Sequence, residues 1–364
     1  MNWFAMSAEI LFVFLFSLVF LLIASKLAMP LGLVDRPSQR KHHQGVIPLV
    51  GGISVYAGIC FALLFTDQTI ADSQLYLLCA GVLVLLGAID DRFDISVKLR
   101  VAIQTLVAIS MMLFADLYLR SFGYIFGSHE TLLGFWGYPL TLLACWAAIN
   151  SFNMIDGIDG LLGGLSSVAF LSLGLLFYQA GSSQLALFCF AMLSAIVPYL
   201  LLNLAILGRR YKVFMGDAGS TLIGFTLIWL LLQGSQSSQP AINPVTALWV
   251  LAIPLMDMVV IMYRRLHKGG SPFSADRQHI HHLIMRAGFS SRQACLLITL
   301  AAAILATIGV VADLLTVIPQ WLMFALFLCM FFFYAYLVKH PWRFARYIKR
   351  VKRRYQADKH KPNP

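Results

Sequence analysis

The chain has 364 residues, of which 60% are hydrophobic and only 12% are charged. Soluble globular domains average about 25% charged residues, so a chain this long with half that fraction lacks the polar surface to cover itself in water. The composition therefore excludes an ordinary soluble enzyme and places the chain in a lipid bilayer. The formal net charge is +11, and the positions of the basic residues bear on how the chain is oriented.

Blocks of about 16 to 22 apolar residues alternate with short polar stretches, a pattern typical of a polytopic helical membrane protein. About eleven transmembrane helices are predicted, over residues 9–29, 45–65, 74–90, 99–116, 131–149, 160–179, 184–204, 213–232, 244–263, 293–312 and 318–338. We therefore expect an all-α fold with a single integral membrane domain over 1–338 and a basic cytoplasmic tail over 339–364.

Lysine and arginine are distributed unevenly between the two sets of loops that these spans would create. Of the 27 Lys and Arg residues, 26 fall on one side and only Arg120 falls on the other. Loops rich in these residues stay in the cytoplasm, so we expect the amino terminus outside and the carboxyl terminus and functional groups inside. In the tail, basic residues are interleaved with aromatic ones, which favours contact with an anionic leaflet over nucleic-acid binding.

Two adjacent carboxylates, Asp90 and Asp91, end the third predicted span. A carboxylate drawn into the hydrocarbon costs about 2.5 to 3.5 kcal/mol, and neighbouring like charges repel unless a cation neutralises them. The pair therefore indicates a bound cation, although a helix end capped by Arg92, Lys98 and Arg100 is an equal alternative.

A more specific motif follows the fifth span, where Asn150, Asn153, Asp156 and Asp159 recur at every third position. Residues three apart share a helix face, and this loop contains no basic residue. Carboxylate and amide oxygens without a protein cation are typical of a divalent metal site, and an all-oxygen set favours Mg²⁺, or Mn²⁺ in its place, over zinc. A purely structural turn is the alternative.

Asp217 lies among small residues at the start of the eighth span, in the stretch Phe-Met-Gly-Asp-Ala-Gly-Ser. Helix amino termini attract anions such as phosphate, and Asp217 would repel a phosphate unless it held a metal between them. An ordinary turn explains this stretch equally well.

The longest inner loop supplies the opposite charge, with Arg265 followed by His279, His281 and His282. The histidine spacing suggests a metal site, but the absence of cysteine and the nearby arginines favour phosphate binding over zinc. Together the inner loops hold acidic groups for Mg²⁺ and basic groups for phosphates at the edge of the hydrocarbon. This combination predicts phosphoryl transfer between a soluble nucleotide and a lipid phosphate.

In this order, the Asp-Asp pair, the Asn-Asp motif, the Gly-Asp motif and His-Ile-His-His resemble the motifs of the polyprenyl-phosphate N-acetylhexosamine-1-phosphate transferases, over nearly the whole chain. The His-Ile-His-His form and the length of the fifth inner loop favour the N-acetylglucosamine branch over the phospho-N-acetylmuramoyl-pentapeptide transferase branch. The resemblance implies transfer from UDP-N-acetylglucosamine to undecaprenyl phosphate, with UMP released, at the start of O-antigen or enterobacterial common antigen synthesis. It also implies a multi-pass protein of the bacterial inner membrane, with a periplasmic amino terminus.

The resemblance further implies roles for twelve residues. The catalytic residues beside the lipid phosphate and the nucleotide would be Asp90, Asp91, Asp156 and Asp159. The metal ligands would be Asp217 and Asn153. The substrate-binding residues would be Lys98, Asn203, Arg265, His279, His281 and His282. The lipid phosphate is largely dianionic at neutral pH, so we expect it to attack in a single displacement rather than through an acyl-phosphate on aspartate. The oligomeric state is left open between a monomer and a homo-oligomer.

Two other protein classes compete with this interpretation. A CDP-alcohol phosphatidyltransferase also has an aspartate-glycine run, but the Ala-Arg that should follow Gly160 is absent. A cation-coupled transporter would place ion ligands near the middle of interrupted spans, and here only Asp257, a turn after Pro254, is a candidate. We expect Asp257 instead to pair with a basic group near the cytoplasmic end of its span.

Overall fold

The computed structural model describes residues 3–36, 45–65, 70–271 and 279–340. Most of the predicted basic tail over 339–364 therefore lies outside the described residues. The helices are α1 (Trp3–Leu31), α2 (Gly51–Phe65), α3 (Ser73–Phe93), α4 (Val97–Phe114), α5 (Gly137–Ile155), α6 (Leu161–Gln179), α7 (Ser183–Asn203), α8 (Gly216–Ser235), α9 (Pro244–Val250), α10 (Ala252–His267), α11 (Ile280–Arg286), α12 (Ser291–Leu315) and α13 (Gln320–Lys339). Short 3₁₀ turns cover Gly134–Trp136 and Arg209–Tyr211.

The prediction of an all-α polytopic membrane protein is confirmed. The strands among the described residues are only β1 (Val34–Asp35) and β2 (Ile47–Pro48), which pair antiparallel. In the same part of the chain, eight helices are long and apolar enough to cross a membrane, or nine if α9 and α10 form one broken span. The helix α2 has only 15 residues, so the total of eleven spans stays a prediction.

The ninth predicted span is not straight, and the prediction of one helix over 244–263 is wrong. The chain bends by 80° between α9 and α10, at Leu251. Pro254 explains the break, because it has no N–H to donate to the carbonyl of Val250 and its ring would clash there in a continuous helix. In the first turn of α10 the missing N–H costs nothing, since that group would have no helical partner.

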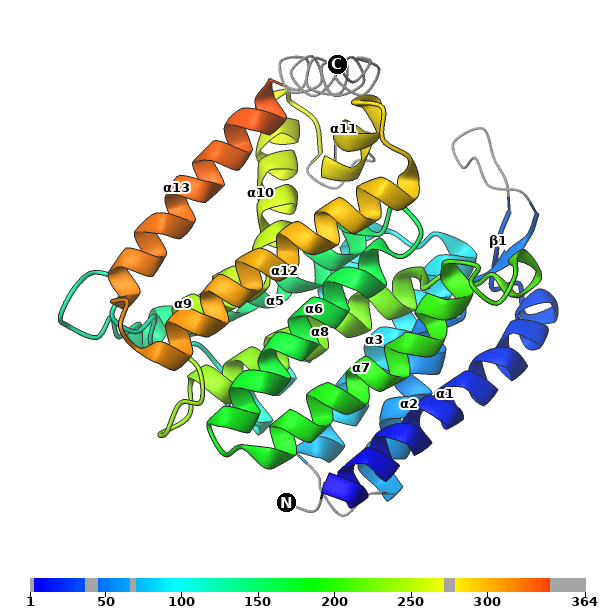
Figure 1. Cartoon of the computed structure of the whole chain (residues 1–364), viewed down its shortest axis with the longest axis horizontal. Coiled ribbons are helices and arrows are strands. Elements are labelled where there is room, and N and C mark those ends of the chain that lie inside the picture. The colour runs from blue at the N-terminus through cyan, green and yellow to red at the C-terminus, as the bar shows by residue number, and fades with distance from the viewer. Residues whose placement is uncertain (1–2, 37–44, 66–69, 272–278, 341–364) are drawn as a thin grey trace, which may run out of the picture.

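The helices run up and down the bundle, so the start of α1 and the end of α13 lie at opposite ends of it (Figure 1). This arrangement agrees with termini on opposite sides of a membrane, although which side is the cytoplasm stays a prediction. Because successive helices alternate in direction, the ends of α3, α5 and α7 and the starts of α4, α6 and α8 gather at one end.

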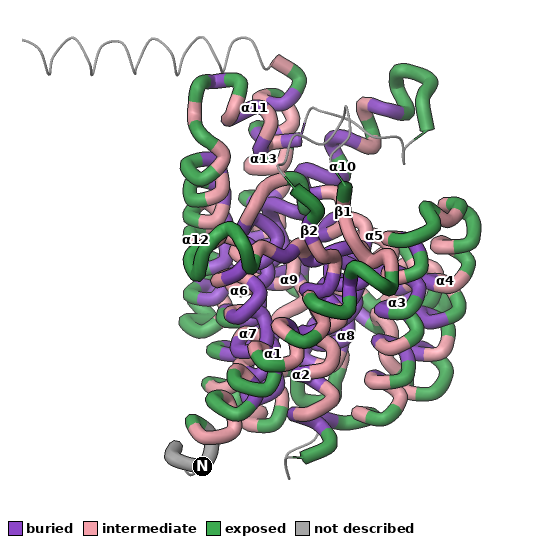
Figure 2. The backbone as a smooth tube through the Cα atoms, turned by 90° about the vertical axis from the view of Figure 1, so that its right-hand side faces the viewer, coloured by how far each residue is buried: buried purple, intermediate pink, exposed green. Residues whose placement is uncertain are grey.

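Helix α8 lies at the centre of the bundle, packed against α2, α3 and α5. Trp229 and Phe225 of α8 are fully buried and surround Tyr76 of α3, whose hydroxyl lies 2.7 Å from the hydroxyl of Thr226. The exposed apolar residues lie on the outer helices, such as α1, α4 and α12 (Figure 2). An apolar exterior around a packed core is what a bilayer requires, since lipid tails are as apolar as leucine.

Small residues allow the neighbouring helices to approach the beginning of α8. A Cβ on Gly52 of α2 would lie 2.1 Å from the backbone nitrogen of Gly219, and one on Gly87 of α3 would lie 2.3 Å from that of Ala218. Membrane helices commonly use such residues for close backbone contact. Here the contacts hold the first turn of α8, which carries Asp217, against the end of α3, which carries Asp90 and Asp91.

Candidate active site

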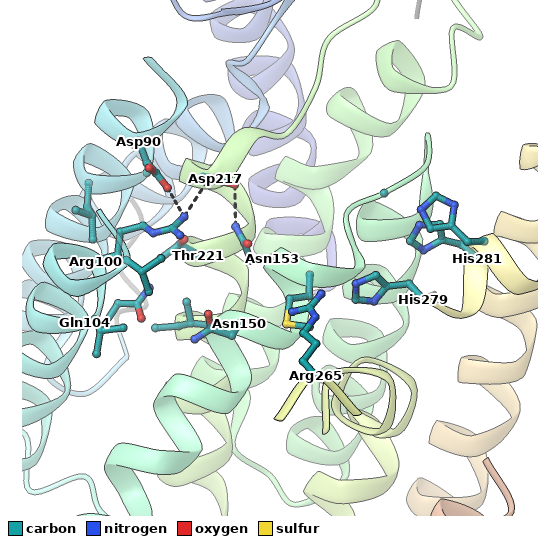
Figure 3. Close-up of a pocket in the computed structure, with 18 residues that line it drawn as sticks. Asp90, Arg100, Gln104, Asn150, Asn153, Asp217, Thr221, Arg265, His279 and His281 are labelled. Carbon is teal, nitrogen blue, oxygen red and sulfur yellow. Dashed lines mark hydrogen bonds and ion pairs between the residues drawn. The ribbon is translucent and has the colours of Figure 1, made fainter. Parts of the chain in front are cut away.

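A cavity of about 270 Å³ opens where the ends of α3 and α5 meet the starts of α4 and α8, with α10 and α11 on its other side (Figure 3). Its polar lining residues are Asp90, Arg100, Gln104, Asn150, Asn153, Asp217, Thr221, Arg265, His279, His281 and His282. Seven of the twelve predicted site residues are in this set. The other five, which lie outside the lining, are Asp91, Asp156, Asp159, Lys98 and Asn203.

The first turn of α8 is fixed by Asp91. Its Oδ1 accepts a hydrogen bond of 3.0 Å from the backbone N–H of Asp217, where the amide groups at a helix start have no helical partner. Gly216, at the start of α8, has a left-handed φ of +72°, and a Cβ there would lie 2.4 Å from the Asp91 carboxylate. The structure therefore gives Asp91 a holding role beneath the cavity and explains why glycine precedes Asp217.

Asp90 points the other way along the end of α3 and is buried. Its Oδ1 accepts from the backbone N–H of Ile95 at 2.9 Å, and its Oδ2 accepts from Arg100 Nη1 at 2.5 Å. The same Arg100 nitrogen lies 3.6 Å from Asp217 Oδ2, so Arg100 stands between the two carboxylates (Figure 3). The adjacent aspartates of the sequence thus face different protein partners.

Asn153, in the last turn of α5, contacts Asp217 directly. Its Nδ2 donates to Asp217 Oδ1 at 2.8 Å and to the Ser220 hydroxyl at 3.1 Å. Through this contact, the side-chain amide of Asn153 and the carboxylate of Asp217 lie side by side in the cavity wall. Because Asn153 and Asp217 are 64 residues apart, only helix packing brings them together.

The donor set at this point fits Mg²⁺ bound together with a substrate. Among the described residues, no group of three or more His, Cys, Asp or Glu side chains is arranged to hold a metal. Mg²⁺ is commonly held by one or two protein oxygens, with phosphate oxygens and water completing its octahedron. Asp217 and Asn153 match that smaller requirement.

The opposite wall of the cavity is basic and carries Arg265 of α10, His279 just before α11, and His281 and His282 in α11. The rings of His279 and His281 are parallel, with centroids 5.7 Å apart. A Cβ on Gly157 would lie 2.3 Å from His281 Nε2, so the loop after α5 packs directly on this ring. The motifs of the fifth span and of the longest inner loop therefore meet, as the sequence predicts.

His281 is a neutral group in this wall. Burial, followed by the neighbouring His282 and His279, lowers the pKa of His281 from 6.5 to about 3. Neither of its ring nitrogens has a hydrogen-bond partner among the described residues, although the side chain is almost fully buried. A buried polar group without a partner is costly, which is consistent with a ligand that would bond to it.

Asp156 and Asp159 do not line the cavity with Asn150 and Asn153. Asp156 follows the last residue of α5 and is exposed. Asp159 accepts from Lys212 Nζ at 2.6 Å, so a lysine from the α7–α8 connection neutralises it. The sequence motif contains no basic residue of its own, but the fold brings Lys212 to it. Of the four oxygen-bearing residues of the motif, Asn150 and Asn153 line the cavity, and Asp156 and Asp159 do not.

Asn203 is predicted as a substrate-binding residue. In the structure its side chain forms hydrogen bonds with two backbone groups. Its Oδ1 accepts from the N–H of Gly160 at 2.6 Å, and its Nδ2 donates to the carbonyl of Val213 at 2.9 Å. It is buried and ties the start of α6 to the segment before α8. It supports the site from outside the cavity.

Lys98 is the predicted phosphate contact on α4, and its neighbours Arg100 and Gln104 are not among the predicted site residues. Lys98 is exposed and outside the cavity, whereas Arg100 and Gln104 line it one helical turn apart. Thr221 of α8 was also missed. The available signal was spacing, because residues four apart share a helix face and Thr221 lies four residues after Asp217.

This site and fold define an integral membrane enzyme whose cavity pairs acidic with basic groups at one end of a helical bundle. The family described as Glycosyl transferase family 4 matches residues 73–235, from α3 to α8. The undecaprenyl-phosphate alpha-N-acetylglucosaminyl 1-phosphate transferase of Yersinia pestis is 65% identical over 362 residues, covering 99% of both chains. The enzyme of that name from Escherichia coli is 63% identical over 99% of this chain and 98% of its own.

The corresponding protein of Pasteurella multocida is 53% identical over 351 residues, which cover 96% of this chain and 98% of its own. The chain therefore belongs to the polyprenyl-phosphate N-acetylhexosamine-1-phosphate transferases, and the resemblance seen in its motifs is confirmed. The CDP-alcohol phosphatidyltransferase and transporter alternatives are excluded by this membership.

Replacing Arg100 and Lys98 in turn tests which basic residue of α4 serves the site. We expect Arg100→Gln to lower kcat/KM of the transferase reaction by about 10- to 150-fold, the equivalent of one lost charge-assisted hydrogen bond. Lys98→Gln should stay within about twofold of the unchanged protein, since exposed charges contribute little. Nucleotide release from detergent-solubilised protein is the measurement. The reverse ranking would show that Lys98, not Arg100, reaches the substrate.

Proposed function

We propose that the protein transfers N-acetylglucosamine 1-phosphate from UDP-N-acetylglucosamine to undecaprenyl phosphate, releasing UMP and forming undecaprenyl-diphospho-N-acetylglucosamine. The observation that carries the proposal is the 65% identity to the Yersinia pestis enzyme across 99% of both chains. The cavity supports it, because acidic groups for a metal face basic groups for phosphates at the edge of an apolar bundle.

The two walls of the cavity suggest how the substrates divide. Arg265, His279 and His282 offer donors for the diphosphate of the nucleotide sugar, and Arg100 offers a guanidinium for the acceptor phosphate. Asp90 positions Arg100, because its Oδ2 accepts a hydrogen bond from the guanidinium group. Bringing both phosphates into one cavity provides the proximity and orientation on which phosphoryl transfer depends.

Asp217 and Asn153 would hold Mg²⁺, or Mn²⁺ in its place, with phosphate oxygens and water filling the remaining positions. When bound, the ion would neutralise the diphosphate and the developing charge on the leaving UMP. Asn153 would have to release Asp217 Oδ1, which its amide now occupies, or share that oxygen with the ion. The hydroxyl of Ser220 would remain as an alternative partner for the Asn153 amide.

In the reaction we propose, an oxygen of the lipid phosphate forms a bond to the sugar-bearing phosphorus of the donor. The bond from that phosphorus to the bridging oxygen breaks, and the oxygen leaves with UMP. The acceptor is already largely dianionic at neutral pH, so no general base is required.

The residue placement also supports a cytoplasmic site in the bacterial inner membrane. Arg100, Lys212 and Arg265 lie at the end of the bundle that holds the cavity, while Arg120 lies in the loop after α4 at the other end. By the positive-inside rule, the cavity faces the cytoplasm, where nucleotide sugars are available. The lipid-linked sugar formed there would start O-antigen or enterobacterial common antigen synthesis.

Removing the carboxylate at Asp217 tests the metal proposal. We expect Asp217→Asn to reduce UMP release by about 100-fold or more, because one charged ligand is lost where charge develops. Asp116→Asn is the matched control, since Asp116 is an exposed carboxylate beside Arg120 at the far end. Chelation should abolish activity of the unchanged protein, and added Mg²⁺ should restore it. Full activity after thorough chelation would refute the metal assignment.

A panel of donors tests the substrate. Purified protein with Mg²⁺ and undecaprenyl phosphate should release UMP from UDP-N-acetylglucosamine and at least about tenfold more slowly from UDP-N-acetylmuramoyl-pentapeptide, because the relatives that are 63–65% identical over 99% of this chain are named for N-acetylglucosaminyl transfer. Equal turnover of the two donors would contradict the choice of branch.

The configuration at phosphorus tests the single displacement. A donor made chiral at the sugar-bearing phosphorus should give an inverted product, because one in-line attack inverts the centre once. Retention, or a phosphorylated aspartate trapped with the donor in the absence of lipid, would show a two-step route instead.

A further inference from the structure

A buried carboxylate that the transfer reaction does not use directly lies behind the basic wall. Asp257 of α10 is only 1% exposed and accepts three hydrogen bonds. His279 Nδ1 lies 2.6 Å from its Oδ2, and the Tyr334 hydroxyl donates to its Oδ1 at 2.6 Å. The backbone N–H of Ile280 donates to the same Oδ1 at 3.0 Å. Asp257 thus joins α10, α13 and the start of α11.

These contacts decide the orientation of the His279 ring. The Tyr334 hydroxyl and the Ile280 amide both donate to Oδ1 of Asp257, so Oδ2 is left to accept from the facing ring nitrogen, Nδ1. Since the two ring nitrogens lie on opposite edges of imidazole, Nε2 is directed away from Asp257.

The ring of His279 lies on the cavity wall beside Arg265, across from Asp90 and Arg100 (Figure 3). Its neighbour His281 has no hydrogen-bond partner at either ring nitrogen in the described part of the chain. The two parallel histidines therefore differ in their partners, because a carboxylate contacts a ring nitrogen of His279 and none contacts those of His281 in the described part of the chain. A carboxylate next to imidazole favours the charged ring, and a charged N–H donor binds an anionic oxygen roughly twice as strongly as a neutral one.

We propose that Asp257 is a positioning residue for His279: it holds the ring through Nδ1 and directs Nε2 toward a phosphate oxygen of the nucleotide sugar, so that the ring can bind this anion as an imidazolium. The inference rests on the proposed function, because it assigns the diphosphate to this wall. Tyr334 and the Ile280 amide keep Asp257 in place by occupying its other oxygen. A transporter-type role for Asp257 would need a carboxylate open to an ion, and three protein donors already saturate it.

Kinetics of Asp257→Asn test the positioning role. The asparagine can satisfy Tyr334 and the Ile280 amide with its oxygen, but its NH₂ group then faces Nδ1 and cannot accept a hydrogen bond from it. We expect kcat/KM for UDP-N-acetylglucosamine to fall about 10- to 100-fold, the difference between a charged and a neutral hydrogen bond. The KM for undecaprenyl phosphate should not change. A general folding defect would instead impair the reaction with both substrates.

A double-mutant cycle separates positioning from packing. His279→Gln keeps a neutral donor near the position of Nε2 but cannot be charged by Asp257. In that background Asp257→Asn should change kcat/KM by less than about twofold, because the two residues act as one unit. Tyr334→Phe is the matched control, since it removes one donor from Asp257 and leaves its contact with His279. Additive losses, or equal losses toward both substrates, would overturn the proposal.

A spectroscopic measurement keeps this inference separate from the proposed function. In protein labelled with ¹⁵N at histidine, the signal lost in His279→Gln should show a proton on Nδ1, and in Asp257→Asn that nitrogen should lose its proton. A His279 without a proton on Nδ1 in the unchanged protein, or with one in Asp257→Asn, would refute the inference whether or not UMP is released. Failure of the unchanged protein to release UMP would refute only the proposed function.

Discussion

The amino end of α8 is the point at which the packing of the bundle and the geometry of the site meet. In a membrane, the free N–H groups at a helix start must find partners within the protein, because lipid offers none. Asp91 supplies a carboxylate to the first of these groups, and Gly216 leaves the space for it. Gly52 and Gly87 let two further helices press against the same turn. Asp217 is consequently held in one place, and Asn153 and Arg100 take their positions around it.

Several charges of the site have a partner within the protein instead of standing alone in an apolar surrounding. Arg100 neutralises Asp90 and approaches Asp217, Lys212 neutralises Asp159, and Asp257 supports His279. Breaking a buried pair by removing one partner costs far more than the net contribution of the intact pair. The substrates we propose would enter this arrangement with their own phosphates and a metal ion, and so exchange one set of compensated charges for another.

A sequence pattern within one segment does not reveal a partner that comes from a distant segment. The loop with Asp159 has no basic residue of its own, which made a metal the natural partner, yet Lys212 fills that place from 53 residues away. Likewise Asp90 and Asp91 are neighbours in sequence but separate on the helix end, because consecutive side chains point in different directions. Asn203, predicted as a substrate contact, ties two backbone segments together through its side chain.

Composition and apolar periodicity alone determined the class of the protein, the approximate bounds of most helices and the loops in which the chemistry lies. These properties are local, since a helix of about 20 residues must be apolar to cross a bilayer whatever its neighbours are. The pairing of Asp217 with Asn153, of Asp91 with the start of α8, and of Asp257 with His279 was decided only by tertiary structure. Such contacts join residues 22 to 126 positions apart, and they depend on which helix faces touch rather than on any pattern within one segment.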